Sequence, residues 1–226
     1  MDKAGDGSKS EASRLAAHVT SLADEGHLSA GMIALCVAVV AASKREEACL
    51  RDALGLACAA GMTAPVLAAA GAEIGLSRGR YARDRYDAAL TEVLGGVPEG
   101  EGDRPLLTHD EARAYFVAHF GSIPERVGCL ADLLPQHFLE YQQIHSAVLH
   151  GTVLERKDAE LILCALNAAD YQHEFVAIHA AGAREAGATE GEIASAAYAT
   201  TLLAGIAAWP VAAAAIVATR GARSAP

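Results

Sequence analysis

Glu160 and His179 carry side chains that could together move protons, and they lie 19 positions apart in a chain of 226 residues. Glu160 begins an apolar run that carries no other charge as far as Asn167–Asp170, and His179 lies in the helical run that follows. Two antiparallel helices joined by a short turn would bring the carboxylate and the imidazole side by side. A carboxylate next to an imidazole orients the ring and raises its pKa, so such a pair can act as general acid and base.

The same two residues also allow a structural interpretation. Glu160 could lie on a solvated helix face near Arg156 or Lys157, and His179 could be a hydrogen-bonded residue of the core. Spacing alone favours this interpretation over catalysis. The assignment therefore depends on what surrounds the pair.

Three aromatic or imidazole side chains nearby could line a cavity around the pair. Phe175 precedes His179 by four residues and shares its helix face, although core packing explains it equally well. Tyr141 and His145 share a face of the preceding helix, where a half-buried position is the better explanation without further support. His173 lies six residues before His179, which does not suit two metal ligands on one helix face. No third ligand is evident, so we expect no metal site.

The composition predicts an all-α protein. Ala dominates the apolar residues, aromatic residues make up 5%, and no sustained Val/Ile/Thr alternation or Asn-Gly hairpin is present. Ala favours helix, and its small side chain lets helices approach one another closely. The formal net charge of −10 argues against a nucleic-acid partner, which would need a basic face. It does not argue against a small anionic substrate.

The cysteines are odd in number, lie mostly within apolar helical runs and never have C-x-x-C spacing. No signal peptide is visible at the N-terminus. These features predict reduced, mostly buried thiols in a cytoplasmic protein. The cysteines are Cys36, Cys49, Cys58, Cys129 and Cys164.

One uncharged segment, Leu202–Ala218, is nearly long enough to cross a bilayer, for which about 20 residues are needed. It consists mostly of Ala and contains Pro210 near its middle. We therefore expect no membrane partner and predict a helix that is buried on all sides, at a subunit interface or in the core.

Capping residues predict where several helices begin. Ser10 and Ser29 each precede a helical run and have side chains that suit an N-cap. Thr63 comes before Pro65, and proline is tolerated in the first turn of a helix. Two further pairs have the spacing of capping boxes, and they are Ser43 with Glu46 and Thr108 with Glu111.

Two glycine-containing stretches are predicted to interrupt the helices. A turn is expected at residues 75–77, and Gly95–Arg104 is Gly-rich and acidic, as linkers are. The chain is therefore divided into an N-terminal unit, a linker and a C-terminal unit. Their predicted bounds are 10–94, 95–107 and 108–220.

The two units resemble each other weakly. In each, an apolar helix leads to a second helix that ends at a glycine, and matching Gly61 to Gly187 gives an offset of 126. The positions that then match Glu160 and His179 hold alanine, so the first repeat is degenerate. Two Ala-rich helical hairpins could also look alike through composition alone.

From Leu134 onward the sequence resembles the carboxymuconolactone decarboxylase and alkylhydroperoxidase-D superfamily. The matching pieces are L-P-Q-H-F-L-E-Y-Q-Q-I-H-S-A-V-L from Leu134, R-K-D-A-E-L-I-L-C-A-L-N-A from Arg156, and His179 followed eight positions later by Gly187 in A-G-A-T-E-G-E-I. The resemblance implies an all-α fold of two tandem helical-hairpin repeats, the first degenerate. It also implies a homo-oligomer, a trimer or a hexamer.

Members of the alkylhydroperoxidase type use a C-x-x-C motif together with an acid and an imidazole that match Glu160 and His179. Here Gln172 and Phe175 stand at the two cysteine positions, so thiol peroxidase chemistry by that route should be absent. The decarboxylase branch also lacks the cysteine pair and works without a cofactor. The resemblance thus implies that His179 is the general acid/base and Glu160 its orienting partner. The residues expected to bind the substrate are Tyr141, His145, Gln172 and Phe175.

The expected reaction is decarboxylation, isomerisation or a related proton transfer on a small carbonyl or lactone substrate. One alternative is an oxidoreductase that uses another thiol, of which Cys164 is the nearest in sequence. The other is a non-catalytic oligomeric scaffold. A filled space between Glu160 and His179 would favour the scaffold, and a solvent-connected pocket would count against it.

Overall fold

The computed structural model describes residues 10–96, 107–150 and 153–220. Within these ranges the regular elements are all helices, and none is a strand. The all-α fold class is therefore confirmed. Most of the linker predicted at 95–107 lies outside the described residues.

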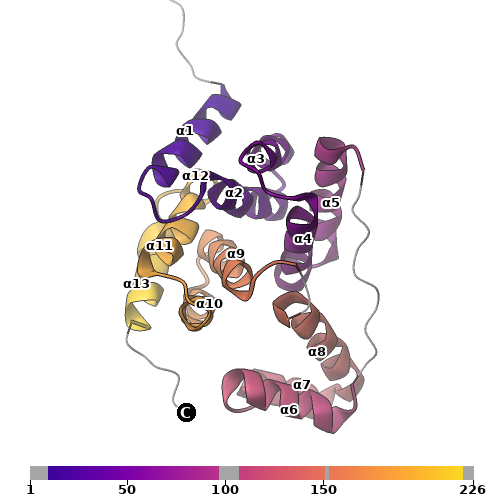
Figure 1. Ribbon diagram of the computed structural model, residues 1–226. Coiled ribbons are helices and arrows are strands. Elements are labelled where there is room, and N and C mark those ends of the chain that lie inside the picture. The colour runs from indigo at the N-terminus through magenta and orange to yellow at the C-terminus, as the bar shows by residue number, and fades with distance from the viewer. Residues whose placement is uncertain (1–9, 97–106, 151–152, 221–226) are drawn as a thin grey trace, which may run out of the picture.

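The helices fall into two series (Figure 1). The first comprises α1 Glu11–Ala23, α2 Ala30–Lys44, α3 Glu47–Ala59, α4 Ala64–Arg78 and α5 Arg80–Leu94. The second comprises α6 His109–Phe120, α7 Glu125–Leu133, α8 Pro135–His150, α9 Arg156–Ala169, α10 His173–Glu185, α11 Glu190–Ala199, α12 Thr201–Ala204 and α13 Ala208–Ala218.

Helices α2 and α9 form the centre of the molecule (Figure 1). Every residue of α2 from Gly31 to Ala42 is buried, and so is every residue of α9 from Ala159 to Ala169. A helix that is apolar all round must be covered on all sides. The other helices provide that cover: α1, α3, α4, α5, α11 and α12 pack on α2, and α4, α8, α10, α11, α12 and α13 pack on α9.

The backbone repeats with the predicted offset of 126. Helices α2, α3 and α4 begin at 30, 47 and 64, and α9, α10 and α11 begin at 156, 173 and 190. The residues with positive φ also match in pairs, which composition cannot explain. These pairs are Arg45 and Tyr171 at 65° and 59°, Gly61 and Gly187 at 89° and 93°, and Gly79 and Gly205 at 79° and 80°. The two-repeat architecture is therefore present.

Contacts between the repeats are reciprocal. Helix α4 of the first repeat packs on α9 of the second, and α11 of the second packs on α2 of the first. Exchange of this kind relates the repeats by an approximate two-fold rotation. Each repeat thus completes the core of the other.

Helices α6 and α7 have no counterpart in the first series. With the start of α8 they enclose a small separate core of Ala112, Phe116, Val127, Ala131 and Phe138. Helix α8 itself matches α1 at the common offset. We propose that the second repeat begins near Pro135 and that α6 and α7 are inserted before it, whereas the sequence-based division placed the boundary at 108.

Most predicted helix starts are confirmed. The side chains of Ser10 and Ser29 accept hydrogen bonds from backbone N–H groups of their helices, and Thr63 precedes α4 with proline in its first turn. Thr108 and Glu111 form a complete capping box at α6. Local side-chain chemistry was therefore a good guide to these boundaries.

Two predicted boundaries in the first repeat were wrong. Ser43 lies inside α2, where its hydroxyl donates to the Val40 carbonyl oxygen, and Glu46 precedes α3 without a side-chain cap. The turn predicted at 75–77 is absent, because α4 continues to Arg78 and ends at Gly79. Gly75 serves close helix packing instead, since a Cβ there would lie 3.2 Å from Arg83 Cδ on α5.

The apolar segment Leu202–Ala218 is not one buried helix. It is interrupted at Gly205, whose φ is 80°, and α13 buries Ala212 and Ile216 while Val217 is 56% exposed. In the part of the chain that the structure describes, no helix combines the length and apolar character that a membrane crossing needs.

Candidate functional site

Glu160 and His179 meet across the hairpin of α9 and α10. The His179 Nδ1 atom lies 2.9 Å from Glu160 Oε2. The Glu160 side chain is 4% exposed and that of His179 is 16% exposed. The predicted approach of the two side chains is therefore present, and it places a carboxylate in the interior with an imidazole at its edge.

Gly182 makes room for the Glu160 carboxylate. It lies in α10 one turn beyond His179, and a Cβ at this position would overlap both carboxylate oxygens of Glu160. The carboxylate therefore packs directly on the α10 backbone. A buried carboxylate needs space of this kind as well as a hydrogen-bond donor.

Arg156 approaches the Glu160 carboxylate from the side opposite His179. Its Nε atom lies 3.9 Å from Glu160 Oε1, and its Nη2 donates to Glu185 Oε2 at 3.2 Å. A carboxylate only accepts hydrogen bonds, so His179 must donate through Nδ1–H. The Nε2 atom of His179 is then left as the proton acceptor, as in other carboxylate-oriented histidines.

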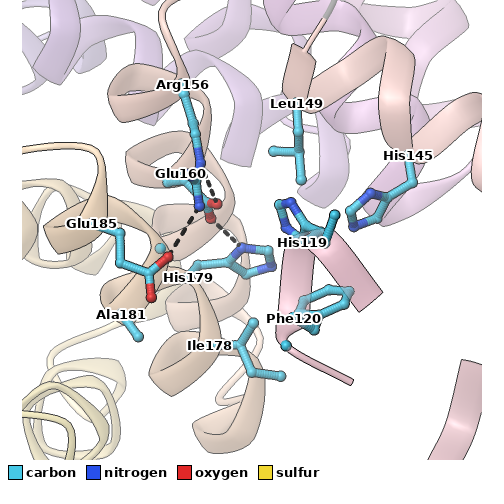
Figure 2. Close-up of a pocket in the computed structure, with 13 residues that line it drawn as sticks. His119, Phe120, His145, Leu149, Arg156, Glu160, Ile178, His179, Ala181 and Glu185 are labelled. Atoms are coloured by element: carbon cyan, nitrogen blue, oxygen red, sulfur yellow. Dashed lines mark hydrogen bonds and ion pairs between the residues drawn. The ribbon is translucent and has the colours of Figure 1, made fainter. Parts of the chain in front are cut away.

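The facing wall comes from α6 and α8 and is aromatic. His119 and Phe120 end α6, and His145 and Leu149 stand on α8 (Figure 2). The rings of His119 and His145 are nearly perpendicular, with centroids 5.0 Å apart. His145 is 6% exposed, and its Nδ1 atom lies 2.8 Å from the hydroxyl of Tyr115.

A pocket of about 480 Å³ lies between these two walls. Pockets for small molecules have volumes of this order, roughly 300–1,000 Å³. Figure 2 shows His179 on one side with His119 and His145 opposite. The lining residues are Ala118, His119, Phe120, Gly121, His145, Leu149, Arg156, Glu160, Ile178, His179, Ala181, Gly182 and Glu185.

Of the predicted substrate-binding residues, His145 lines this pocket and three others do not. Tyr141 packs in the core of α6–α8, with its ring stacked 5.7 Å from Phe116. Gln172 and Phe175 are exposed at the start of α10. The pocket follows α10 from His179 towards its C-terminal end, away from Phe175. A substrate-binding role for Tyr141, Gln172 and Phe175 stays a prediction.

Sequence reasoning missed the α6 wall. His119 and Phe120 lie 60 and 59 positions before His179, and only the tertiary fold brings them together. Arg156 carried a visible signal, because it stands one helical turn before Glu160, whereas Glu185 lies six residues after His179 and does not share its helix face.

Glu73 on α4 is a further residue that the sequence did not single out. Its side chain is fully buried, and among the described residues neither carboxylate oxygen has a hydrogen-bond partner. Burial raises the pKa of Glu73 well above its ordinary value, and the nearby charge of Glu160 raises it further. The position of Glu73 therefore favours its neutral form more than an exposed site would.

The first repeat has no such site. At the common offset, Gly182 matches Leu56 and Glu160 matches Ala34, so a large apolar side chain stands where the second repeat leaves room and the acid is lost. Helix α1 also packs on α3, whereas α8 does not pack extensively on the equivalent α10. The pocket occupies the space where that packing is missing.

The thiols do not take part in this pocket. Cys164 is fully buried in α9, and burial raises its pKa to about 12. Among the described residues, no three His, Cys, Asp or Glu side chains are arranged to hold a metal ion.

Comparison with known proteins agrees with this fold. Residues 135–219 match the model of the Carboxymuconolactone decarboxylase family, and this range contains both Glu160 and His179. A comparison with curated proteins found no match. The resemblance predicted from the sequence is confirmed.

One solved structure with the same fold comes from Burkholderia xenovorans and is provisionally described as a gamma-carboxymuconolactone decarboxylase subunit. It superposes with a TM-score of 0.64 at 20% sequence identity, over 92% of this chain and 85% of that chain. At 20% identity this structural similarity is evidence for the fold alone.

Proposed function

Because residues 135–219 match the Carboxymuconolactone decarboxylase family, we propose that this chain is a cofactor-independent enzyme of related chemistry. It moves a proton by general acid/base catalysis during decarboxylation or isomerisation of a small carbonyl or lactone substrate. The observation that carries the proposal is the Glu160–His179 hydrogen bond at the edge of a pocket of about 480 Å³.

The chemistry follows from the orientation of the imidazole. With Nδ1–H held by Glu160, the Nε2 atom of His179 removes a proton from a carbon next to the substrate carbonyl. Glu160 then stabilises the imidazolium that forms, at an observed Nδ1 to Oε2 distance of 2.9 Å. Return of the proton to a different carbon gives isomerisation. In decarboxylation the C–C bond to the carboxylate breaks, its electron pair moves into the carbonyl group as an enolate, and the enolate carbon takes up a proton from His179 that water replaces.

Two observations favour this proposal over the alternatives. The scaffold alternative predicted a filled space between Glu160 and His179, and a pocket of about 480 Å³ that both residues line counts against it. For the thiol alternative, the nearest thiol in sequence is that of Cys164, whose side chain is fully buried with a pKa of about 12. A thiolate is the reactive form of cysteine, and this environment suppresses it.

We also propose that the enzyme acts as a homo-oligomer in the cytoplasm. Large apolar side chains remain exposed on α7, in the turn before α13 and on α13, as on surfaces that another subunit covers. Examples are Leu133 at 71%, Ile206 at 64% and Val217 at 56%. Sedimentation analysis of the purified chain measures the subunit number directly, and a monomer at micromolar concentration would contradict the proposal.

Proton transfer can be measured with two simple probes. The first probe is α-angelica lactone, which isomerises by moving a ring proton. NMR in deuterated water follows this reaction as deuterium incorporation. The second probe is acetoacetate, which reports decarboxylation because it loses carbon dioxide. Replacing His179 with Ala should lower the rate by about 10²- to 10⁴-fold, the usual contribution of a general base. Exposed His173 at the start of the same helix provides the control, because His173→Ala should keep the full rate.

The outcomes separate clearly. An unchanged rate in His179→Ala would remove this residue from the mechanism. No turnover of either probe by the unaltered chain would contradict the proposed reaction class.

A further inference from the structure

The buried carboxylate of Glu160 needs more positive charge nearby than a neutral imidazole supplies. The Glu160 side chain is 4% exposed, and among the described residues its ion-pair partners are His179 and Arg156. In the proposed reaction His179 begins as a neutral base, so it donates a hydrogen bond to Glu160 without balancing its charge. An ionised carboxylate in the interior is costly unless a cation lies near it. In the resting site, the cation that remains is Arg156.

Arg156 is held between two carboxylates (Figure 2). Its Nε atom lies 3.9 Å from Glu160 Oε1, one turn away on α9, and its Nη2 atom donates to Glu185 Oε2 of α10 at 3.2 Å. A separation of 3.9 Å is too long for a hydrogen bond, so Arg156 acts on Glu160 through its charge. An arginine is not deprotonated in proteins, and this charge is therefore constant over the working pH range.

The Nε–H group of Arg156 is an unusual donor. It is buried and, in the part of the chain that the structure describes, has no hydrogen-bond partner. The same atom is the one that approaches Glu160 Oε1. A buried donor without a hydrogen bond lowers stability, so the guanidinium is kept beside this carboxylate at a local cost. Local costs of this kind are expected at functional sites.

The first repeat lacks the whole group of charges. At the common offset of 126, alanine stands at each of the four matching positions. The matches are Ala30 for Arg156, Ala34 for Glu160, Ala53 for His179 and Ala59 for Glu185. The repeat without the acid–base pair is thus also without Arg156 and Glu185, as expected for residues that act together.

From these contacts we propose that Arg156 is a positioning residue that keeps Glu160 ionised while His179 is neutral. Its fixed charge holds the resting pair as a carboxylate and a neutral imidazole, with the Nε2 atom of His179 unprotonated. When His179 takes up the substrate proton, Glu160 becomes the partner of the imidazolium, and Arg156 keeps Glu185 as its partner. The inference rests on the proposed function, and it names the residue that keeps the base unprotonated.

The buried acids around Glu160 do not supply this charge. Burial raises the pKa of Tyr115 on α6, of Cys164 on α9 and of Glu73 on α4. The negative charge of Glu160 contributes to each of these shifts. All three groups therefore favour their neutral forms more than exposed groups would.

The other cations of α9 and α10 are directed elsewhere. Arg184 on α10 and Lys157 on α9 form ion pairs with carboxylates of α11, and among the described residues neither pairs with Glu160. His119 and His145 line the facing wall, and an imidazole gains or loses its proton near neutral pH. Arg156 is thus the fixed positive charge beside Glu160.

Replacing Arg156 with Gln tests the proposal without a substrate. NMR of the full ¹⁵N-labelled chain follows protonation of His179, whose signals are assigned by their loss in His179→Gln. Removing a nearby positive charge favours the imidazolium, so His179 in Arg156→Gln should keep its second proton to a pH about one unit higher. Arg156→Lys retains a positive charge and should restore most of the original titration. The same titration in Arg156→Gln as in the unaltered chain would overturn the proposal.

Arg113 on α6 provides a matched control. Its side chain is 36% exposed, close to the 35% of Arg156, and it lies 2.7 Å from the carboxylate of Asp132. Arg113→Gln removes the same charge without touching the pair, so the titration of His179 should stay as it is. Equal shifts in Arg113→Gln and Arg156→Gln would reveal a general effect of net charge and contradict a specific role for Arg156.

The pH profile of proton exchange into α-angelica lactone tests the same role during catalysis. This lactone is uncharged, so loss of the cation cannot act through attraction of the substrate. Arg156→Gln should lower the rate by about tenfold on the acid side of the profile and leave it unchanged on the alkaline side, where His179 is neutral in both chains. A misplaced Glu160 would instead lower the rate equally at every pH, and that result would overturn the proposal.

The two experiments separate the two levels of inference. If the unaltered chain does not turn over the lactone, the proposed function fails. The NMR titration still decides whether Arg156 controls the proton on His179.

Discussion

Lys44 Nζ and Asp170 Oδ1 lie 2.6 Å apart, although the two residues occupy equivalent positions of the two repeats, 126 residues apart. Equivalent residues that touch must lie on the axis that relates the repeats. Arg78 joins them, with its Nε atom 2.8 Å from Asp170 Oδ2 and its Nη2 donating to the Leu166 carbonyl oxygen at 2.6 Å. This cluster fixes the end of α9, and with it the turn that leads to α10 and His179.

Replacing Asp170 with Ala should therefore lower the free energy of unfolding by about 1–2 kcal/mol, since a hydrogen-bonded charge is lost and two cations are left unpaired. Solvent weakens this interaction only modestly, because the Arg78 side chain is 17% exposed and the Asp170 side chain is 30% exposed. Urea unfolding measures the change. Asp84→Ala is the control: its pair with Arg80 is highly exposed and long at 3.7 Å, so a shift within about 0.5 kcal/mol is expected. If Asp170→Ala and Asp84→Ala lowered the free energy of unfolding equally, the cluster of Lys44, Asp170 and Arg78 would contribute no more than an exposed ion pair does.

Glu73→Gln should make the protein more stable at neutral pH. The folded-state pKa of Glu73 lies well above the ordinary value of 4.5, so above pH 4.5 the unfolded chain releases this proton while the folded chain keeps it. Stability of the unaltered chain consequently falls as pH rises from 4.5 towards the folded pKa. Glutamine has the same shape but cannot ionise, and the stability of the Glu73→Gln variant therefore does not fall in this way as pH rises.

Denaturant titrations of both chains at pH 4.5 and pH 7 test this. The stability gained by Glu73→Gln should be near zero at the lower pH and grow with pH by up to about 1.4 kcal/mol per pH unit, for as long as the folded chain keeps the proton. Glu25→Gln, at an exposed position after α1, should show no such pH dependence. A gain that is the same at both pH values would contradict a buried neutral acid.

Gly182→Ala should separate the pair without unfolding the chain. The added methyl group would overlap the Glu160 carboxylate, which must then move away from His179. We expect a loss of about 1–3 kcal/mol from overpacking and a fall of at least tenfold in proton transfer.

The first repeat offers a matched control for this substitution. Gly55 also lies inside a helix, but a Cβ there would meet nothing within 4 Å. Gly55→Ala should therefore stabilise the chain by about 0.5–1 kcal/mol, because alanine is the better helix former. If Gly182→Ala changed neither the free energy of unfolding nor the rate of proton transfer, close packing of the Glu160 carboxylate against α10 would not be required.

The sequence predicted the features that depend on local chemistry or on repetition. The N-cap at Ser10, the capping box of Thr108 and Glu111, and the offset of 126 all follow from short patterns, and each is present. Glu160 and His179 could be paired because a single hairpin separates them. In each case, neighbours in the chain carry the information.

Features that depend on distant packing could not be predicted in this way. The turn expected at 75–77 is overridden by close contact between α4 and α5, with Gly75 against Arg83. The α6 wall reaches His179 only because α8 stands away from α10, and no local pattern encodes that separation. The raised pKa of Glu73, which lies on α4 and is influenced by Glu160 on α9, likewise depends on helices from both repeats.

The cysteines should differ sharply in reactivity, and this bears on the remaining thiol alternative. Cys164 is fully buried with a pKa of about 12, so at pH 7 only about one thiol in 10⁵ is ionised, whereas Cys129 is exposed. A thiol reagent such as iodoacetamide, followed by mass spectrometry, should label Cys129 in the native chain and Cys164 only after unfolding. Cys164→Ala should leave proton transfer from α-angelica lactone unchanged. Labelling of Cys164 in the native state, together with loss of peroxide reduction in the alanine variant, would instead identify a thiol enzyme.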